Sequence, residues 1–333
     1  MKKNRILVTG GAGYVGSMLV PELLKAGFAV TVFDLYLYGK DVFSNYRKDF
    51  DLKEVYGDIR DTELLKETMK DCKIIIHLAC ISNDPSFELD PLLGKSINFD
   101  CFKPMVITAR KSGIERFIYA SSSSVYGIKN ERDVKEDAVC QPLTDYSRFK
   151  LECEKILINE CGSGNMTRII VRPATICGYA PRLRLDLTVN ILTIHALVNK
   201  KIRIFGGKQL RPNLNIKDMV RAYKLLLNAP HNIVDGVPFN VGYQNKSVEE
   251  IAKIVKATLG DEAIKLSYEE TNDTRSYHIN SDRIRDKLGF EPEYTIEDAI
   301  ESIVSAYKDG LIVNPMSNSL YYNIKRMQEI KLL

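Results

Sequence analysis

The sequence predicts an α/β fold, in which helices cover both faces of a doubly wound parallel sheet. The first observation is a regular alternation of short β-branched runs and helical patterns through the first half of the chain. The second is a glycine-rich turn, from Gly10 to Gly16, between the first such run and the first helical pattern. After about Pro173 this alternation breaks down, so we expect a smaller, mixed α/β region there.

In the first half, six β-branched or apolar runs are expected to form strands. They are Arg5–Thr9, Ala29–Asp34, residues 53–56, residues 73–77, Arg116–Ala120 and residues 168–172. Helical patterns separate them, at residues 14–26, Thr62–Met69, residues 92–111 and residues 145–160. Because alternating strands and helices form parallel sheets, we expect a site where the carboxyl ends of the strands meet.

The second half contains a different succession of elements. Residues 181–186 break the pattern, and a helix is expected to follow up to residue 199. A strand at 202–205 and helices at 217–227, Val248–Leu259 and 295–308 come next, and some strands of this half can rejoin the main sheet. We therefore divide the chain into residues 1–173, residues 174–313 and a tail at 314–333. The tail could dock on the body, pair with another subunit or fray.

Composition and charge exclude several classes of protein. With 333 residues, 45% of them hydrophobic and 27% charged, the chain can bury a full core and is typical of a soluble globular protein. Its 47 basic and 43 acidic residues are scattered, so neither nucleic acid nor a membrane is expected as a partner. The seven cysteines and four histidines show no metal-ligand spacing. We expect a reduced, cytoplasmic protein without a metal.

The glycine-rich turn is the expected phosphate-binding site. Gly10, Gly13 and Gly16 have the spacing G-x-x-G-x-x-G, and Tyr14 and Val15 lie between the last two. Glycine lets the backbone turn sharply and lets a diphosphate approach the free N–H groups of a helix N-terminus. Placed between a strand and a helix, this turn predicts a Rossmann-like dinucleotide site.

Acidic and small residues at the next strand ends specify the dinucleotide. Asp34 ends the second strand, where its carboxylate can accept both hydroxyls of an adenosine ribose and would repel a 2′-phosphate. No arginine follows it directly, which favours NAD over NADP. Asp58 could accept a hydrogen bond from the adenine amino group or cap the following helix. Leu78 and Ala79 after the fourth strand would let the cofactor lie against the backbone.

The candidate catalytic residues are Ser122, Tyr146 and Lys150. Tyr146 and Lys150 lie four residues apart, so on a helix they share one face. A phenol titrates near ~10, and a neighbouring ammonium lowers that pKa, which makes proton exchange with a sugar or steroid hydroxyl possible. Ser122, in a serine run at the end of the fifth strand, could bind the reacting oxygen. The pair alone also fits an exposed helical face, and the run also fits a polar turn.

Together these motifs resemble the extended branch of the short-chain dehydrogenase/reductase superfamily, whose members modify nucleotide sugars. The resemblance spans nearly the whole chain and rests on residues 9–16, Asp34, 57–60, 77–79, 122–127, Tyr146 with Lys150, and 172–173. It implies that Tyr146 is the acid/base, that Lys150 binds the nicotinamide ribose, and that Ser122 binds the sugar 4-oxygen. It also implies that Ile59 and Asn98 contact NAD, and that the protein is a homodimer formed through two long helices.

The resemblance extends to the substrate site in the second half. Arg211 and Arg275 match two arginines that contact the nucleotide diphosphate, for which their forked donors are suited. Ser123 and Asn190 are further candidates for substrate binding. Residues 181–187 closely resemble a subgroup that includes sugar-nucleotide 4-epimerases and a GDP-heptose 4-dehydrogenase.

One departure from the family narrows the expected chemistry. The 4,6-dehydratases carry an acidic residue or pair just after the catalytic threonine, where this chain has Ser123 and Ser124. We therefore predict an enzyme that uses NAD to oxidise C4 of a nucleoside-diphosphate sugar, first of all as an epimerase in glycan biosynthesis. The alternatives are a 4-dehydrogenase that releases a 4-keto sugar, then a 4,6-dehydratase, then a non-catalytic NAD-binding sensor.

Overall fold

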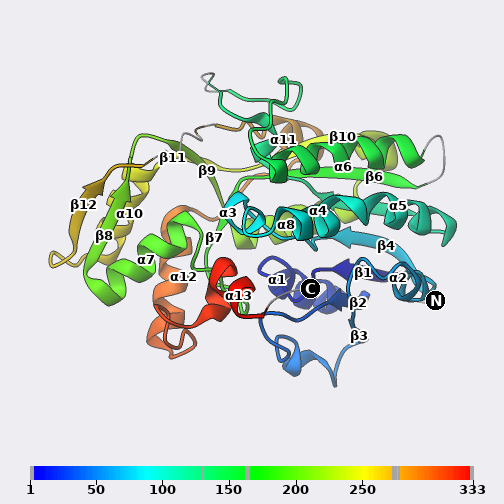
Figure 1. Cartoon of the computed structure of the whole chain (residues 1–333), viewed down its shortest axis with the longest axis horizontal. Coiled ribbons are helices and arrows are strands. Elements are labelled where there is room, and N and C mark those ends of the chain that lie inside the picture. The colour runs from blue at the N-terminus through cyan, green and yellow to red at the C-terminus, as the bar shows by residue number, and fades with distance from the viewer. Residues whose placement is uncertain are drawn as a thin grey trace.

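The computed structural model describes residues 4–330 except 130, 132, 162–165, 272–275 and 277. A seven-stranded parallel sheet forms the centre of this described part (Figure 1). Its strands lie in the order β10 (Val237–Val241), β6 (Thr167–Pro173), β5 (Arg116–Ala120), β4 (Cys72–His77), β1 (Arg5–Thr9), β2 (Ala29–Asp34) and β3 (Leu52–Tyr56). The predicted doubly wound parallel sheet is confirmed.

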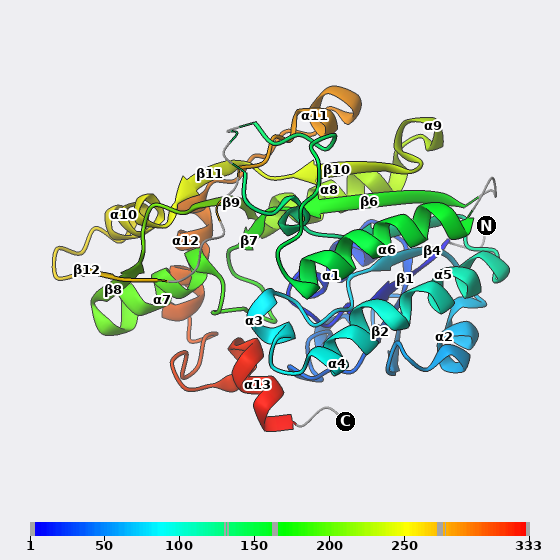
Figure 2. The ribbon, with the colours of Figure 1, turned by 45° about the horizontal axis from the view of Figure 1, so that its top comes forward.

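Helices cover both faces of this sheet (Figure 2). One layer contains α1 (Gly16–Lys25) and α8 (Ile216–Asn228), and the other contains α2 (Thr62–Met69), α5 (Phe102–Lys111) and α6 (Asp145–Cys161). In β1, Ile6 and Val8 pack in the core beneath α1, and Leu7 packs in the core beneath α5. Successive side chains of a strand point to opposite faces, so a strand that is buried on both faces is apolar throughout.

The helix expected at residues 92–111 is wrong as a single element. The structure has α4 (Pro91–Lys95), a π-helical turn (Ser96–Asp100) and α5 in its place. A π-turn inserts one residue into the helical hydrogen-bond ladder and often marks a functional site. Here it brings Ile97 to the wall of the large cavity described below.

The second half of the chain builds a smaller lobe, on the left of Figure 1. Two small sheets belong to it: β11 (Gln244–Ser247), β9 (Leu210–Asn215) and β7 (Thr175–Cys177) form one, and β12 (Lys265–Glu269) and β8 (Lys201–Phe205) form the other. The helices α7 (Thr188–Asn199), α10 (Val248–Leu259) and α12 (Ile296–Lys308) pack around a core of their own. The shorter helices are α3 (Asp84–Phe87), α9 (His231–Val234) and α11 (Asp282–Leu288).

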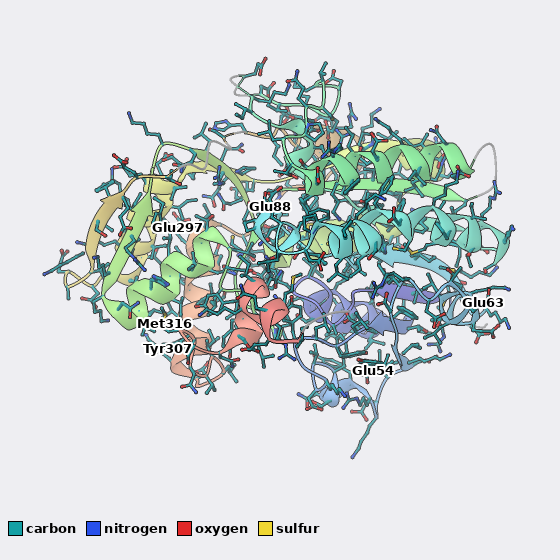
Figure 3. The ribbon with its side chains drawn as sticks, in the orientation of Figure 1. Glu54, Glu63, Glu88, Glu297, Tyr307 and Met316 are labelled. Atoms are coloured by element: carbon teal, nitrogen blue, oxygen red, sulfur yellow. The ribbon has the colours of Figure 1, made fainter. Side chains whose placement is uncertain are left out.

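The C-terminal tail docks on the body, which was one of its three expected outcomes. It contains a 3-10 turn (Ser319–Tyr321) and helix α13 (Asn323–Ile330), which lies beside α3 in both views (Figures 1 and 2). Met316 in this tail and Tyr307 of α12 both pack against the main core and lie in the same part of Figure 3. Among the described residues, no helix is long and apolar enough to cross a membrane.

Candidate active site

A cavity of about 450 Å³ lies at the carboxyl edge of the main sheet. Residues at the ends of six parallel strands line it: Gly10, Asp34, Asp58, Ala79, Ser122 and Pro173. The strand order reverses between β1 and β4, and the crevice at such a switch point is where open α/β sheets bind their ligands. The volume is within the range of small-molecule and cofactor sites.

The glycine turn brings bare backbone to this cavity. A Cβ on Gly10, whose φ is +71°, would lie 2.5 Å from the backbone nitrogen of Ala79. A Cβ on Gly16 would lie 2.2 Å from the carbonyl oxygen of Gly11, so helix α1 packs directly on the turn. Gly10, Gly13 and Gly16 line the cavity, as do Tyr14 and Val15. Small residues at the helix N-terminus thus leave room for a diphosphate, and the turn fits a dinucleotide such as NAD.

Asp34 ties the glycine turn to the end of β2. Its Oδ2 accepts a hydrogen bond from Ala12 N at 2.9 Å, and its Oδ1 accepts one from Tyr36 N at 2.7 Å. Burial raises the pKa of Asp34, although both hydrogen bonds oppose that rise. A carboxylate has about four acceptor positions, so the two that remain can receive ribose hydroxyls.

Asp58 also lines the cavity, but its carboxylate is held by Arg60. The Nη2 of Arg60 lies 2.6 Å from Oδ2 of Asp58, and this ion pair lowers the pKa of Asp58 although burial acts to raise it. The expectation that Asp58 caps the next helix is wrong. Asp61 caps α2 instead, because its side chain accepts a hydrogen bond from Leu64 N at 3.0 Å.

Ser122, Tyr146 and Lys150 meet at the cavity. Lys150 Nζ donates to the carbonyl oxygen of Ala120 at 2.7 Å and lies 5.8 Å from the centre of the Tyr146 ring. Ser122 begins the 3-10 turn Ser123–Tyr126, and its Oγ accepts hydrogen bonds from the backbone nitrogen and the hydroxyl of Ser124. A serine, a tyrosine and a lysine that are distant in sequence therefore share one site.

The pKa of Tyr146 is raised, whereas the spacing to Lys150 predicts a lowered value. Burial raises the pKa of Tyr146 well above its ordinary value, and the nearby Cys80 and Asp84 act in the same direction. The physical reason is that desolvation of the phenolate dominates. The ammonium of Lys150 is bound to the Ala120 carbonyl, and the charge that favours the phenolate is that of Arg184.

Two predicted site residues have other positions. Asn98 is absent from the cavity wall; its side chain donates to the carbonyl oxygen of Ile81 and accepts from the Ile81 nitrogen, so it fixes the loop after β4. Asn190 is fully buried and bonds to Tyr14 Oη and to the carbonyl oxygen of Arg184. The polar groups of these amides bond within the protein and support the cavity wall, and their contact with a ligand stays a prediction.

Two of the three remaining substrate-binding candidates, Arg211 and Ser123, line the cavity. Arg211, on β9, lines the cavity and donates to the carbonyl oxygen of Leu210 at 3.1 Å. Ser123 also lines the cavity and is buried. Arg275 lies outside the described residues.

Sequence reasoning missed a group of polar residues between β7 and α7. Arg182, Arg184 and Asp186 line the cavity, whereas the intervening Leu183 and Leu185 are buried in the main core. Arg184 forms an ion pair with Asp186 (Nε to Oδ1, 2.9 Å). The alternation of charged and apolar residues in this segment is the signal of an extended chain with one face on the core and the other on a site.

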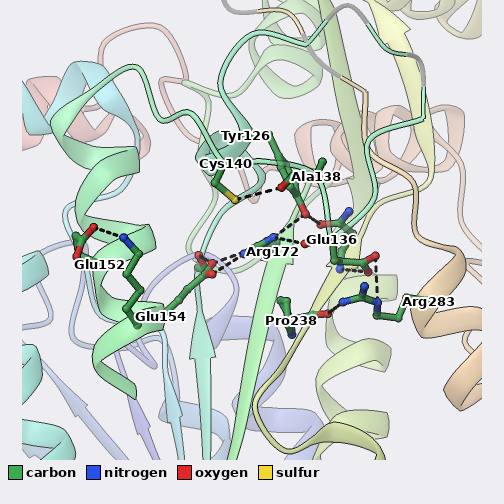
Figure 4. A network of polar contacts seen from close by, with 12 residues as sticks. Tyr126, Glu136, Ala138, Cys140, Glu152, Glu154, Arg172, Pro238 and Arg283 are labelled. Atoms are coloured by element: carbon green, nitrogen blue, oxygen red, sulfur yellow. Dashed lines mark hydrogen bonds and ion pairs between the residues drawn. The ribbon is translucent and has the colours of Figure 1, made fainter. Parts of the chain in front are cut away.

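A buried polar network fixes α6, the helix that carries Tyr146 and Lys150 (Figure 4). Glu154 of this helix accepts two hydrogen bonds from Arg172 of β6, at 3.0 and 2.7 Å, and a short one from the Ser121 hydroxyl. Burial acts to lower the pKa of Arg172, but the carboxylate of Glu154 outweighs it and the pKa rises. The helix is therefore tied to β6 and to the end of β5, two of the strands whose ends line the cavity.

Comparisons with known proteins agree with this geometry. The model of the NAD-dependent epimerase/dehydratase family matches residues 6–242. A UDP-glucose 4-epimerase of Lactobacillus helveticus is 27% identical, over 91% of this chain and 96% of that protein. The low-salt glycan biosynthesis protein Agl12 of Haloferax volcanii is 26% identical, over 91% of this chain and 98% of that protein. The solved structure of MoeE5 with UDP-glucose and NAD has a TM-score of 0.81 at 25% identity, over 92% of this chain and 100% of that one.

Proposed function

The chain belongs to the NAD-dependent epimerase/dehydratase family, and we propose that it inverts C4 of a nucleoside-diphosphate sugar through a 4-keto intermediate. The observation that carries this proposal is the single cavity that joins the glycine turn and Asp34 to Ser122, Tyr146 and Lys150. NAD, when bound, accepts a hydride from the sugar carbon and can return it to the opposite face of the keto sugar.

Each catalytic side chain has a defined task in this proposal. The oxygen of Tyr146 takes the proton of the sugar C4 hydroxyl as the hydride leaves, and gives it back when the hydride returns. The hydroxyl of Ser122 donates a hydrogen bond to the same sugar oxygen. Lys150 holds the ribose next to the reacting carbon and supplies a positive charge near Tyr146. The raised pKa of Tyr146 means that the phenol must first give its own proton to solvent, which nearby positive charge favours, before its oxygen can take the proton of the sugar.

The substrate that we propose is a UDP-sugar. Relatives named UDP-glucose 4-epimerase and a structure that holds UDP-glucose support this choice. Arg211 is placed on the cavity wall contributed by the second lobe, where it can bind the substrate diphosphate. We assign NAD binding mainly to residues 1–173 and sugar-nucleotide binding mainly to residues 174–313. The likeness to a glycan biosynthesis protein supports a role in making glycans.

Two other reactions start with the same oxidation of C4. A 4-dehydrogenase would release the keto sugar, and a 4,6-dehydratase would go on to remove water. Dehydration needs an acid and a base near C5 and C6, and the structure has the hydroxyls of Ser123 and Ser124 beside Ser122. Neither hydroxyl does the work of a carboxylate at neutral pH, so the residues at these two positions favour oxidation without dehydration.

The proposal is tested by incubating the purified enzyme with a panel of UDP-, dTDP- and GDP-sugars. We expect NAD(H) to be released when the protein is denatured, and NMR to show that one pair of C4 epimers is interconverted without accumulation of NADH. Stoichiometric NADH together with a keto sugar would identify a 4-dehydrogenase instead. Bound cofactor without any change in any sugar would favour the non-catalytic sensor.

We also propose that the enzyme is a homodimer in the cytoplasm. The long helices α5 and α6 pack against each other on one face of the sheet, and near them Leu92 and Ile158 are exposed apolar side chains that a second copy could cover. The six cysteines whose side chains are described are free thiols, which suits a reducing compartment. A mass near 37.8 kDa, that of one chain, in light scattering would refute the dimer, and recovery outside the cytoplasm on fractionation would refute the location.

A further inference from the structure

Arg182 is a buried cation on the cavity wall, and part of its guanidinium has no hydrogen-bond acceptor. Only 4% of the residue is exposed, and it lines the cavity wall. Its Nη2 donates to Oδ1 of Asn323 in α13, and its guanidinium lies 3.6 Å from the centre of the Tyr38 ring. Among the residues that the structure describes, Nε and Nη1 have no hydrogen-bond acceptor.

Such an arrangement is costly unless an anion completes it. A buried polar donor without a partner loses its hydrogen bonds to water and forms no hydrogen bond in the protein. The free-energy cost is larger for a charged group. Burial lowers the pKa of Arg182 to about 10, so the guanidinium remains positive at neutral pH. Two unpaired donors on one planar guanidinium, in a residue that lines the cavity, match the oxygens of a phosphate.

Arg182 lies on the side of the cavity where the dinucleotide is expected to bind. Its backbone nitrogen donates to the hydroxyl of Ser17 in the first turn of α1, the helix that follows the glycine turn. Burial raises the pKa of Asp34 and the charge of Arg182 opposes that rise, which places Arg182 near the expected ribose site. A 2′-phosphate on that ribose would be repelled by the Asp34 carboxylate. The contact with Ser17 instead points to the diphosphate at the N-terminus of α1 as the anion for Arg182.

We propose that Arg182 binds the diphosphate of the dinucleotide through Nε and Nη1, and that Asn323 of α13 positions its guanidinium. This proposal rests on the NAD-dependence of the enzyme and deepens it. The tail has several contacts that hold α13 over the site. The Nδ2 of Asn323 donates to the Ser82 hydroxyl at 2.9 Å, and Arg326 donates to the carbonyl oxygen of Leu37 at 2.6 Å. The C-terminal helix therefore belongs to the cofactor site.

The test is to measure binding to the Arg182→Gln variant by calorimetry, with three probes. ADP-ribose carries the diphosphate, adenosine carries no phosphate, and UDP reports on the substrate side. We expect the Kd for ADP-ribose and for NAD to rise roughly 10- to 100-fold, which corresponds to the loss of charge-assisted hydrogen bonds, while the Kd for adenosine and for UDP stays the same. Weaker UDP binding with unchanged ADP-ribose binding would overturn the assignment, as would no change with any probe.

Matched variants separate binding from folding. Arg182→Lys keeps the charge and should recover part of the affinity for ADP-ribose. Arg116→Gln is the control, because Arg116 is a partly buried arginine that donates to the carbonyl oxygens of Leu226 and Ala229, away from the cavity wall. Its Kd for ADP-ribose should not change, and thermal melting without ligand shows whether each variant folds.

The role of α13 is tested by Asn323→Ala. We expect a smaller rise in the Kd for ADP-ribose, roughly 3- to 10-fold, because Arg182 remains but its orientation is no longer fixed. Unchanged affinity in this variant would refute the positioning by α13. These measurements use no sugar substrate, so they stand or fall separately from the proposed epimerase activity.

Discussion

Tyr146 illustrates how burial and charge compete at a single residue. Burial raises the pKa of its phenol, and Lys150 is bound to a backbone carbonyl. The phenol is thus a weak acid in a dry site, which is suited to transfer a proton only when a sugar hydroxyl and positive charge are both in place. Catalysis then depends on the oxygen of Tyr146 itself rather than on the helix that carries it.

The first prediction concerns this oxygen. Tyr146→Phe keeps the ring and its packing but removes the proton carrier, so turnover should fall roughly 100-fold or more. The Kd for NAD should remain close to that of the wild type, as measured by calorimetry. Near-normal turnover in this variant would show that another group moves the proton.

The second prediction concerns pH and His77. Burial lowers the pKa of His77 from 6.5 to about 3, with a smaller contribution from the charge of Lys150. As the pH falls below about 6.5, the unfolded chain protonates this imidazole, whereas the folded protein keeps it neutral down to about pH 3. Proton uptake therefore stabilises the unfolded state, and the unfolding free energy falls with the pH. Between about pH 7 and about pH 5 this costs about 2 kcal/mol of unfolding free energy.

The measurement is a urea titration of wild type and His77→Gln at both pH values. The variant cannot take up this proton, so its unfolding free energy should fall less than that of the wild type over the same interval. Equal losses in both proteins would show that His77 does not titrate as proposed. The pH dependence that both proteins share reports on their carboxylates.

At this scale the sequence predicts part of the site. Motif residues at strand ends, such as Asp34 and Ser122, reach the cavity because the strand pattern and the topology rules together place them there. The position of Asn190 could not be predicted, because its side chain donates to Tyr14 and to the carbonyl oxygen of Arg184. Tyr14 is far away in the sequence, and no sequence pattern indicates either contact. Arg182 was missed because its burial depends on a tail that lies far along the chain.

At the scale of elements, α6 is held by the ion pair of Glu154 and Arg172 shown in Figure 4. Glu154→Ala leaves the Arg172 guanidinium buried without its carboxylate, and we predict that the unfolding free energy falls by about 3 to 5 kcal/mol. Chemical denaturation measures this loss. A loss below about 1 kcal/mol would mean that solvent reaches the pair.

The same helix offers a matched control in Glu152. It pairs with Lys155 on the exposed face of α6, at 2.7 Å, and it appears beside the network in Figure 4. Glu152→Ala should change the unfolding free energy by no more than about 0.5 kcal/mol. Because both variants replace glutamate by alanine in the same helix, the difference between their losses of unfolding free energy measures the effect of burial.

Elements were predicted well where the hydrophobic period was strong and poorly where it was not. The runs at Arg5–Thr9, Ala29–Asp34 and Arg116–Ala120 are strands with the expected bounds. In the smaller lobe, the strand expected at 202–205 is confirmed as β8. The strands β7, β9, β11 and β12 were not expected, because β11, for example, is polar and has no apolar period. The π-turn between α4 and α5 was hidden in a continuous helical pattern.

At the scale of the whole molecule, the two lobes and the tail share one cavity. The main sheet contributes the strand ends, β9 contributes Arg211, and α13 contributes Asn323. The sequence indicates the doubly wound sheet because the connection rules for successive strands and helices apply to any chain with this alternation. It does not place the tail, because docking of a polar segment depends on surfaces that form only when both lobes are folded.

The most direct test of the proposed epimerase follows the hydride. A nucleoside-diphosphate sugar that carries deuterium at C4 is incubated with the enzyme, and both sugar and cofactor are analysed by mass spectrometry and NMR. We predict that the product epimer retains the deuterium at C4 and that no reduced cofactor accumulates. Deuterium that remains on the released cofactor, with a keto sugar in solution, would show that the hydride does not return and that the enzyme is not an epimerase.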